Sequence, residues 1–131
     1  MPMSDPVINI VLWGIQGLLA ALFLMSGGMK LFAYERYKAV GEQRSPGRDS
    51  GLSRGLVTFI GLSEVAGAIG LVLPWSTGVA PVLTPLAALG LATIMVLGGV
   101  YHARRQEPVV LVIGLFVLAA IVAVGRGFLA G

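Results

Sequence analysis

Of the polar side chains within or at the ends of the long apolar runs, four are the candidates for chemistry: Glu64, Lys30, His102 and Gln16. Glu64 lies roughly nine residues into the run 55–73, ~13 Å along a helix that crosses an apolar core about 30 Å thick. An ionised carboxylate at that depth costs at least about 2.5–3.5 kcal/mol, so the group must be protonated, paired or open to a watered cavity. The sequence leaves two interpretations open: an acid hydrogen-bonded across helices, or a contact for a proton, a quinone or another substrate.

Lys30 is the obvious partner for this acid, because it ends the first apolar run on the same side. If that run is centred near Leu19, however, Lys30 starts about 16 Å from its middle, and the side chain covers only part of the distance. The sequence therefore favours an interfacial anchor over an ion pair. Gln16 lies near mid-membrane, where a neutral amide usually hydrogen-bonds to a neighbouring helix and contributes about 1 kcal/mol or less, and we favour this interpretation over a ligand contact.

His102 is the only histidine, and it ends the third apolar run, where it could cap helix carbonyls or meet a lipid or ligand head group. The chain has no cysteine and a single carboxylate within its apolar runs, so it cannot build a tetrahedral zinc site or a bis-histidine haem site alone. We expect no metal and no cofactor of its own, with a quinone as the one candidate. Nucleotide-binding glycine loops and nucleophile elbows are also absent from the sequence.

The elements that must position these groups are membrane helices. Of the 131 residues, 56% are hydrophobic and 11% are charged, and the mean hydropathy is +0.91, whereas soluble domains carry about 25% charged residues. The first run is too long for a signal-peptide core and has no basic residue before it, so we keep it as a helix. We predict an all-α, integral-membrane bundle of four transmembrane helices in up-down order, forming one domain over 1–131. The expected helices are 7–31, 55–73, 80–101 and 109–125.

Charge sets the expected orientation. Eight of the nine basic side chains fall in or beside segments 32–54 and 102–108, and only Arg126 falls on the other side. The positive-inside rule then places both segments in the cytoplasm and both termini outside. The net charge of +3 therefore reports orientation, and we expect the lipid bilayer and no nucleic acid as a partner.

Small residues predict how the second helix packs. Ser63, Ala66, Gly67 and Gly70 are spaced i, i+3, i+4 and i+7, which places them on one ridge beside Glu64. In lipid such a ridge is a packing surface, because close backbone approach replaces the missing hydrophobic drive between helices. We expect Pro74 to end this helix.

Four motifs, FLMSGGMKLF at 23–32, FIGLSEVAGAIGLVLP at 59–74, LTPLAALGL at 83–91 and HARRQE at 102–107, give the chain a family resemblance. It resembles the DoxX-like family of small bacterial four-helix membrane proteins, over nearly its whole length apart from 33–54. The resemblance implies a four-helix bundle with Lys30, Glu64 and His102 at recurrent polar positions of the family. The family takes its name from a membrane subunit of an archaeal thiosulfate:quinone oxidoreductase, and relatives are linked to membrane oxidoreductase complexes that handle sulfur and oxidative stress.

Two functional hypotheses follow from the residues and the resemblance. The first is an accessory or scaffold subunit of a membrane complex, with a redox complex as one candidate. The second is a subunit of a membrane oxidoreductase that binds a quinone or another lipophilic substrate through Glu64. Both imply other membrane subunits or further copies of the chain as partners, and the sequence does not decide whether the chain is catalytic.

Overall fold

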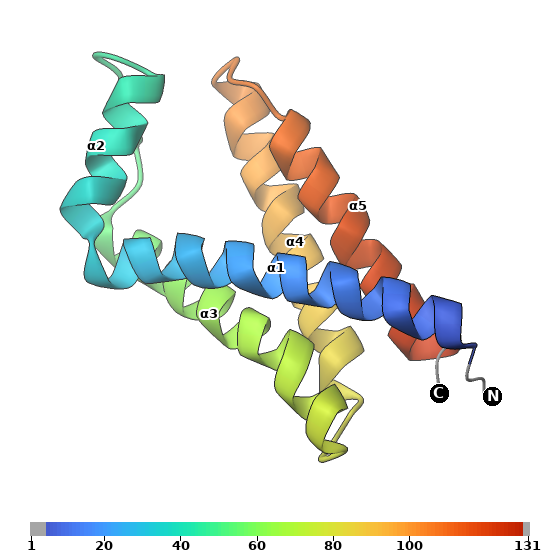
Figure 1. The fold of residues 1–131 in the computed structure, drawn as a ribbon. Helices are drawn as coiled ribbons and strands as arrows, with labels where there is room; N and C mark the ends of the chain where they lie inside the picture. The colour runs from blue at the N-terminus through green and yellow to red at the C-terminus, as the bar shows by residue number, and fades with distance from the viewer. Residues whose placement is uncertain (1–4, 130–131) are drawn as a thin grey trace.

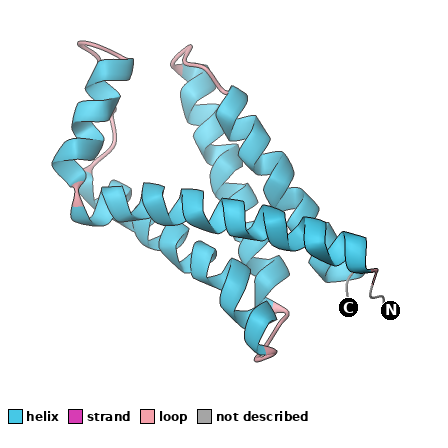
Figure 2. Ribbon diagram, in the orientation of Figure 1, coloured by secondary structure: helices cyan, strands magenta, loops and turns pink. Residues whose placement is uncertain are grey.

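The computed structural model describes residues 5–129, and within them every regular element is a helix (Figures 1 and 2). The ends of the chain, 1–4 and 130–131, lie outside the described residues. Four helical segments are long and apolar enough to cross a membrane, so the predicted all-α fold with four membrane helices is confirmed. The elements are α1 (Pro6–Phe32), α2 (Tyr34–Arg44), α3 (Arg54–Thr77), α4 (Leu83–Arg104), α5 (Val110–Val124) and a closing π-helical turn, η1 (Gly125–Leu129).

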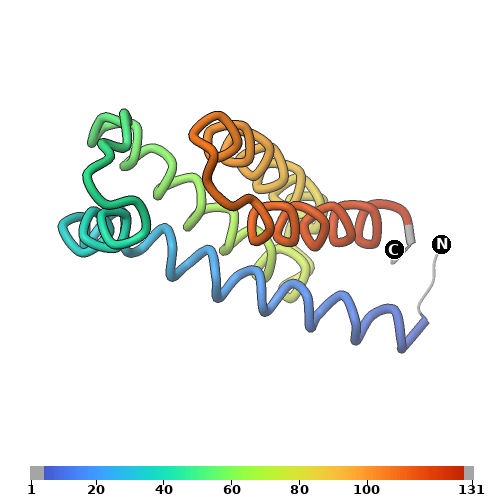
Figure 3. Tube along the Cα trace, turned by 90° about the horizontal axis from the view of Figure 1, so that it is seen from above, coloured from blue at the N-terminus to red at the C-terminus, as the bar shows by residue number. Residues whose placement is uncertain are grey.

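The four long helices form two crossed pairs. α1 packs along α3, α4 packs along α5, and the contact between α3 and α4 joins the pairs. Figure 3 shows α2 and the chain after it at the end of α1 that lies away from the termini. We call this the basic end; it comprises α2, the loop 45–53, the last turn of α4 and the loop 105–109. The start of α1, the 78–82 turn and η1 make up the opposite end.

Local sequence explains where the helices start and stop. The Asp5 carboxylate accepts hydrogen bonds from the backbone N–H groups of Val7 and Ile8, and the Ser53 hydroxyl accepts one from Leu56, so both side chains cap helix N-termini. α3 ends at Gly78, which adopts the left-handed conformation that favours glycine. These caps fix the entry into α1 and both ends of α3.

Pro74 does not end its helix, contrary to our expectation, since α3 continues to Thr77. A proline inside a helix leaves the carbonyl four residues earlier without its N–H donor. Here that carbonyl belongs to Gly70, and it accepts a hydrogen bond of 2.8 Å from the Thr84 hydroxyl of α4. A tertiary contact thus satisfies the group that the proline leaves unpaired.

Two further boundaries differ from the prediction. The third membrane helix was expected from residue 80 but begins at Leu83, because Ala80 has a positive φ that is incompatible with a helix. The predicted loop 32–54 contains α2, an eleven-residue helix that follows a break at Ala33. Only 45–53 is irregular chain.

Glycines allow the close approach of α1 to α3 and of α3 to α4. A Cβ atom on Gly27 would lie 2.7 Å from the carbonyl oxygen of Gly61, so the α1 and α3 backbones touch there. Of the predicted ridge on α3, Gly67 lies against Leu91 and Gly70 against Ala87, both in α4. The other two ridge positions do not share this contact: Ala66 is exposed, and the Ser63 hydroxyl donates to the Phe59 carbonyl of its own helix. α3 therefore uses different glycines for its two neighbours.

Candidate functional site

The first candidate site is a buried ion pair between α1 and α3. The Lys30 Nζ lies 2.9 Å from the Glu64 Oε1 and 2.6 Å from the Ser26 hydroxyl oxygen, and that hydroxyl donates to the same carboxylate oxygen at 3.1 Å. The side chains of Lys30 and Glu64 are only 13% and 5% exposed. We call Ser26, Lys30 and Glu64 the buried triad.

The buried triad forms because α1 and α3 are antiparallel and touch at Gly27 and Gly61. Side chains on a helix lean toward its N-terminus. Lys30 therefore leans away from the basic end while Glu64 leans toward it, and the two side chains converge across the glycine contact. Our prediction that Lys30 is a plain interfacial anchor is wrong. It considered only distance along the helix axis and left out the direction in which the two side chains lean.

A tyrosine from α2 covers the basic side of the triad. The Lys30 Nζ lies 5.3 Å from the centroid of the Tyr37 ring, which is a cation–π contact. Burial raises the pKa of the Tyr37 phenol, and electrostatic interactions with Tyr101, Glu64 and Tyr34 raise it further. Since a nearby negative charge disfavours the phenolate, Tyr37 remains a neutral hydroxyl beside the carboxylate.

His102, in the last turn of α4, belongs to a separate cluster with loop residues of the basic end. Its Nδ1 lies 2.7 Å from the Glu107 Oε1, while Arg105 and Ser45 donate to the Glu107 Oε2 at 3.2 and 3.0 Å. The hydrogen bond from His102, then those from Ser45 and Arg105, hold the pKa of the Glu107 carboxyl at about 2. The cluster ties the 45–53 loop to the 105–109 loop, and the Tyr101 hydroxyl adds a hydrogen bond to the Ser50 carbonyl.

Gln16 lies in a second buried polar site, nearer the opposite end. Its Nε2 donates to the Leu71 carbonyl of α3 at 2.5 Å, and its Oε1 accepts from the Arg126 Nε at 2.6 Å. The Arg126 Nη1 donates to the Asn9 Oδ1 at 3.0 Å, and Arg126 is 4% exposed. Sequence reasoning missed Arg126 because it counted the residue only as an orientation charge. Its position directly after an unbroken apolar run was the available signal.

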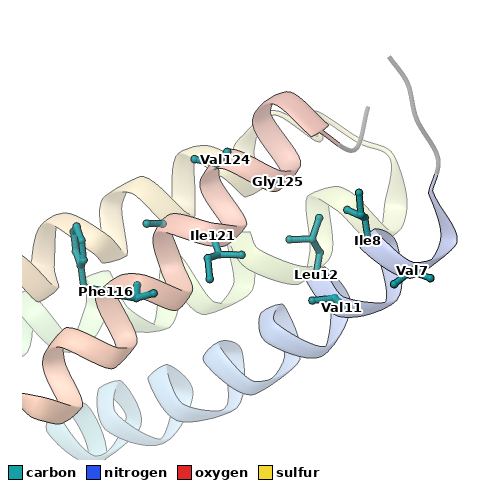
Figure 4. Close-up of a pocket in the computed structure, with 10 residues that line it drawn as sticks. Val7, Ile8, Val11, Leu12, Phe116, Ile121, Val124 and Gly125 are labelled. Carbon is teal, nitrogen blue, oxygen red and sulfur yellow. The ribbon is translucent and has the colours of Figure 1, made fainter.

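Two hollows in the described structure lie on either side of α5. One, of about 580 Å³, lies between α1 and α5 (Figure 4); the other, of about 250 Å³, lies between α4 and α5. Neither is lined by the buried triad or by His102. Within residues 5–129, no three His, Cys, Asp or Glu side chains are grouped so that they could hold a metal ion.

Comparison with known proteins supports one assignment. The family model described as the DoxX-like family matches residues 14–124, which include α2, α3, α4, α5 and most of α1. Neither the curated proteins nor the solved structures give a match.

Proposed function

The chain belongs to the DoxX-like family and is a multi-pass membrane protein, and on that premise we propose that it is an accessory or scaffold subunit of a larger membrane complex. The observation that carries this proposal is the internal neutralisation of Glu64. Its carboxylate, the one acid within the membrane helices, is paired with Lys30 and hydrogen-bonded to Ser26 of the same chain. A charge satisfied in this way stabilises a particular helix arrangement and needs no ligand.

A candidate surface for a partner subunit lies on the outer face of α1. Gly14, Gly17 and Ala21 are spaced i, i+3 and i+7, which places them on one face, and all three are exposed. A Cβ atom added to Gly14 or Gly17 would meet nothing within 4 Å. Small residues at a membrane-exposed surface favour close helix packing, so we assign this face to a helix of another subunit or of a second copy.

The experiment compares Gly14→Leu/Gly17→Leu with Gly114→Leu, a control at an exposed glycine of α5 that also has open space around it. Each tagged variant is extracted from native membranes in mild detergent, and the proteins that co-purify are quantified. The proposal expects the α1 variant to lose its partners while the α5 control keeps them. Complete retention of the partners by the α1 variant excludes this face, and a wild-type chain that purifies alone and monomeric contradicts the scaffold role.

A second function, binding of a quinone or a similar lipophilic molecule, is favoured by one specific observation. The ring of Tyr37 in α2 lies against the Lys30 cation, which is paired with Glu64, and the Tyr37 hydroxyl is neutral. Both groups could donate hydrogen bonds to the carbonyl of a quinone that entered between α2 and the ion pair. In this hypothesis the buried triad is the closed form of a ligand site.

For orientation, we propose that the basic end faces the cytoplasm of a bacterial inner membrane, because eight of the nine Lys and Arg residues lie at or near that end. The native chain has no cysteine, so single substitutions can report each face without background. Gln43→Cys in α2 and Ser76→Cys near the turn at the opposite end are both exposed positions. A membrane-impermeant thiol reagent added to intact cells should label only Ser76→Cys; labelling of Gln43→Cys alone would reverse the orientation.

A further inference from the structure

Arg126 is a buried cation to which the described residues offer no anionic partner. Its Nε and Nη1 donate to the amide oxygens of Gln16 and Asn9, both neutral, and its Nη2 is buried with no acceptor. The ion pairs between described residues all lie at the basic end or in the buried triad. A charge within a membrane span is costly unless it is compensated, so this guanidinium is suited to an anion.

Two indole rings complete the surroundings of the guanidinium. Its Cζ lies 4.7 Å from the ring centroid of Trp75 and 5.3 Å from that of Trp13. Aromatic faces attract cations, but they do so less strongly than an anion that forms charge-assisted hydrogen bonds. We call Arg126, Asn9, Gln16, Trp13 and Trp75 the arginine cage. The two rings are the only tryptophans in the chain, so indole fluorescence reports on this site alone.

An apolar groove begins beside the arginine cage. Leu12 lies three residues after Asn9 and four before Gln16, so it is a neighbour of both on the surface of α1. Leu12 and Gly125, the residue before Arg126, both line the groove between α1 and α5 (Figure 4). Its volume of about 580 Å³ falls within the range of about 300–1,000 Å³ typical of small-molecule sites. All ten lining residues are apolar: Val7, Ile8, Val11, Leu12, Phe116, Val117, Ala120, Ile121, Val124 and Gly125.

We propose that the arginine cage and the groove together bind an anionic phospholipid, with its phosphate on Arg126 and an acyl chain between α1 and α5. Charge complementarity argues for this occupant, because the guanidinium has an unused donor and arginine binds phosphate well. The apolar lining suits an alkyl chain. Because Nη2 is buried in the structure, the proposal requires a side chain that covers it to turn aside when the phosphate binds. The proposal goes beyond the accessory role and does not depend on it.

The test uses tryptophan quenching by lipids with brominated acyl chains. The full chain is reconstituted in phosphatidylcholine vesicles, and dibrominated phosphatidylglycerol or dibrominated phosphatidylcholine is titrated in. Bromine quenches only nearby indoles, so the signal measures which lipid lies beside the arginine cage. A charge-assisted hydrogen bond predicts a preference of about tenfold for the anionic lipid in the wild type.

Three variants separate this site from general electrostatic attraction. Arg126→Gln should lose the preference, and Arg126→Lys, which keeps the charge, should retain part of it even if Arg126→Gln folds poorly. Arg104→Gln removes an exposed cation at the basic end and should behave as the wild type. Equal quenching by the two lipids in the wild type overturns the proposal. A preference that survives in Arg126→Gln also overturns it, whether or not Arg104→Gln keeps that preference.

Discussion

The molecule buries two cations in different ways. Lys30 is matched by a carboxylate of the neighbouring helix at 2.9 Å, whereas Arg126 is held by two amide oxygens and two indole faces. A lysine ammonium is a compact charge that one carboxylate can satisfy, while a planar guanidinium spreads its charge over several donors and can stack on rings. The comparison teaches that the buried triad is a closed site, because its cation has an anionic partner within the chain. The arginine cage is an open site, because its cation is available to an external anion.

The largest loss of stability should come from removing one partner of the ion pair in the closed site. Lys30→Met leaves the Glu64 carboxylate buried with Ser26 as its only remaining partner in the triad, and breaking such a pair costs about 3–5 kcal/mol of the free energy of unfolding. The double variant Lys30→Met/Glu64→Leu removes both charges and should recover most of that loss. Unfolding by sodium dodecyl sulfate titration measures both. If the double variant is as unstable as the single one, the pair is not what destabilised it.

Disrupting the glycine contact that brings Lys30 and Glu64 together should cause the next largest loss of stability. Gly27→Ala forces a Cβ to within 2.7 Å of the Gly61 carbonyl oxygen and should destabilise the bundle by about 1–3 kcal/mol. Gly28→Ala is the matched control, since its added Cβ would meet nothing within 4 Å. We expect the control to be neutral or slightly stabilising, because alanine favours helices. Equal destabilisation by the two substitutions would show that α1 and α3 do not touch at Gly27.

At the open site, Gln16→Leu should cost less, about 1–2 kcal/mol, because it leaves the Arg126 Nε without an acceptor while the indole contacts survive. Thr93→Val is the control, since that exposed hydroxyl bonds only the Leu89 carbonyl of its own helix. The same detergent titration compares the two. A Gln16→Leu chain as stable as the control would mean that the amide does not support the guanidinium.

The smallest effect concerns the surface cluster around Glu107. Its pKa lies at about 2 in the folded chain, against an ordinary value of 4.5, chiefly because of the hydrogen bond with His102. A lowered folded-state pKa stabilises the fold above pH 4.5, and this contribution is lost as the pH falls from 4.5 toward 2. Carbon-13 titration of glutamate carboxyls should find this low value, and His102→Ala should move it toward the ordinary one. An unchanged pKa in that variant would remove His102 as the cause.

Much of the fold could be predicted because lipid imposes length and apolarity on each helix, and the four spans follow from composition alone. Interactions between helices were harder to predict from the sequence. The continuation of α3 through Pro74 depends on the Thr84 hydroxyl, a residue of the next helix. The Lys30–Glu64 pair depends on the direction in which side chains lean, and the site around Arg126 depends on the packing of α1, α3 and η1. Residue spacing within one helix reports none of these.

The central claim is that the buried triad holds helices together and binds no substrate. Its most direct test is the variant Lys30→Met/Glu64→Gln, which removes both charges but keeps the side-chain volumes close to the originals. The variant is expressed in native membranes, and the assembly that co-purifies is assayed for its protein partners, its quinone content and its turnover. The account predicts that all three match the wild type. Intact partners with lost quinone or lost turnover would contradict it and make Glu64 a ligand-binding residue.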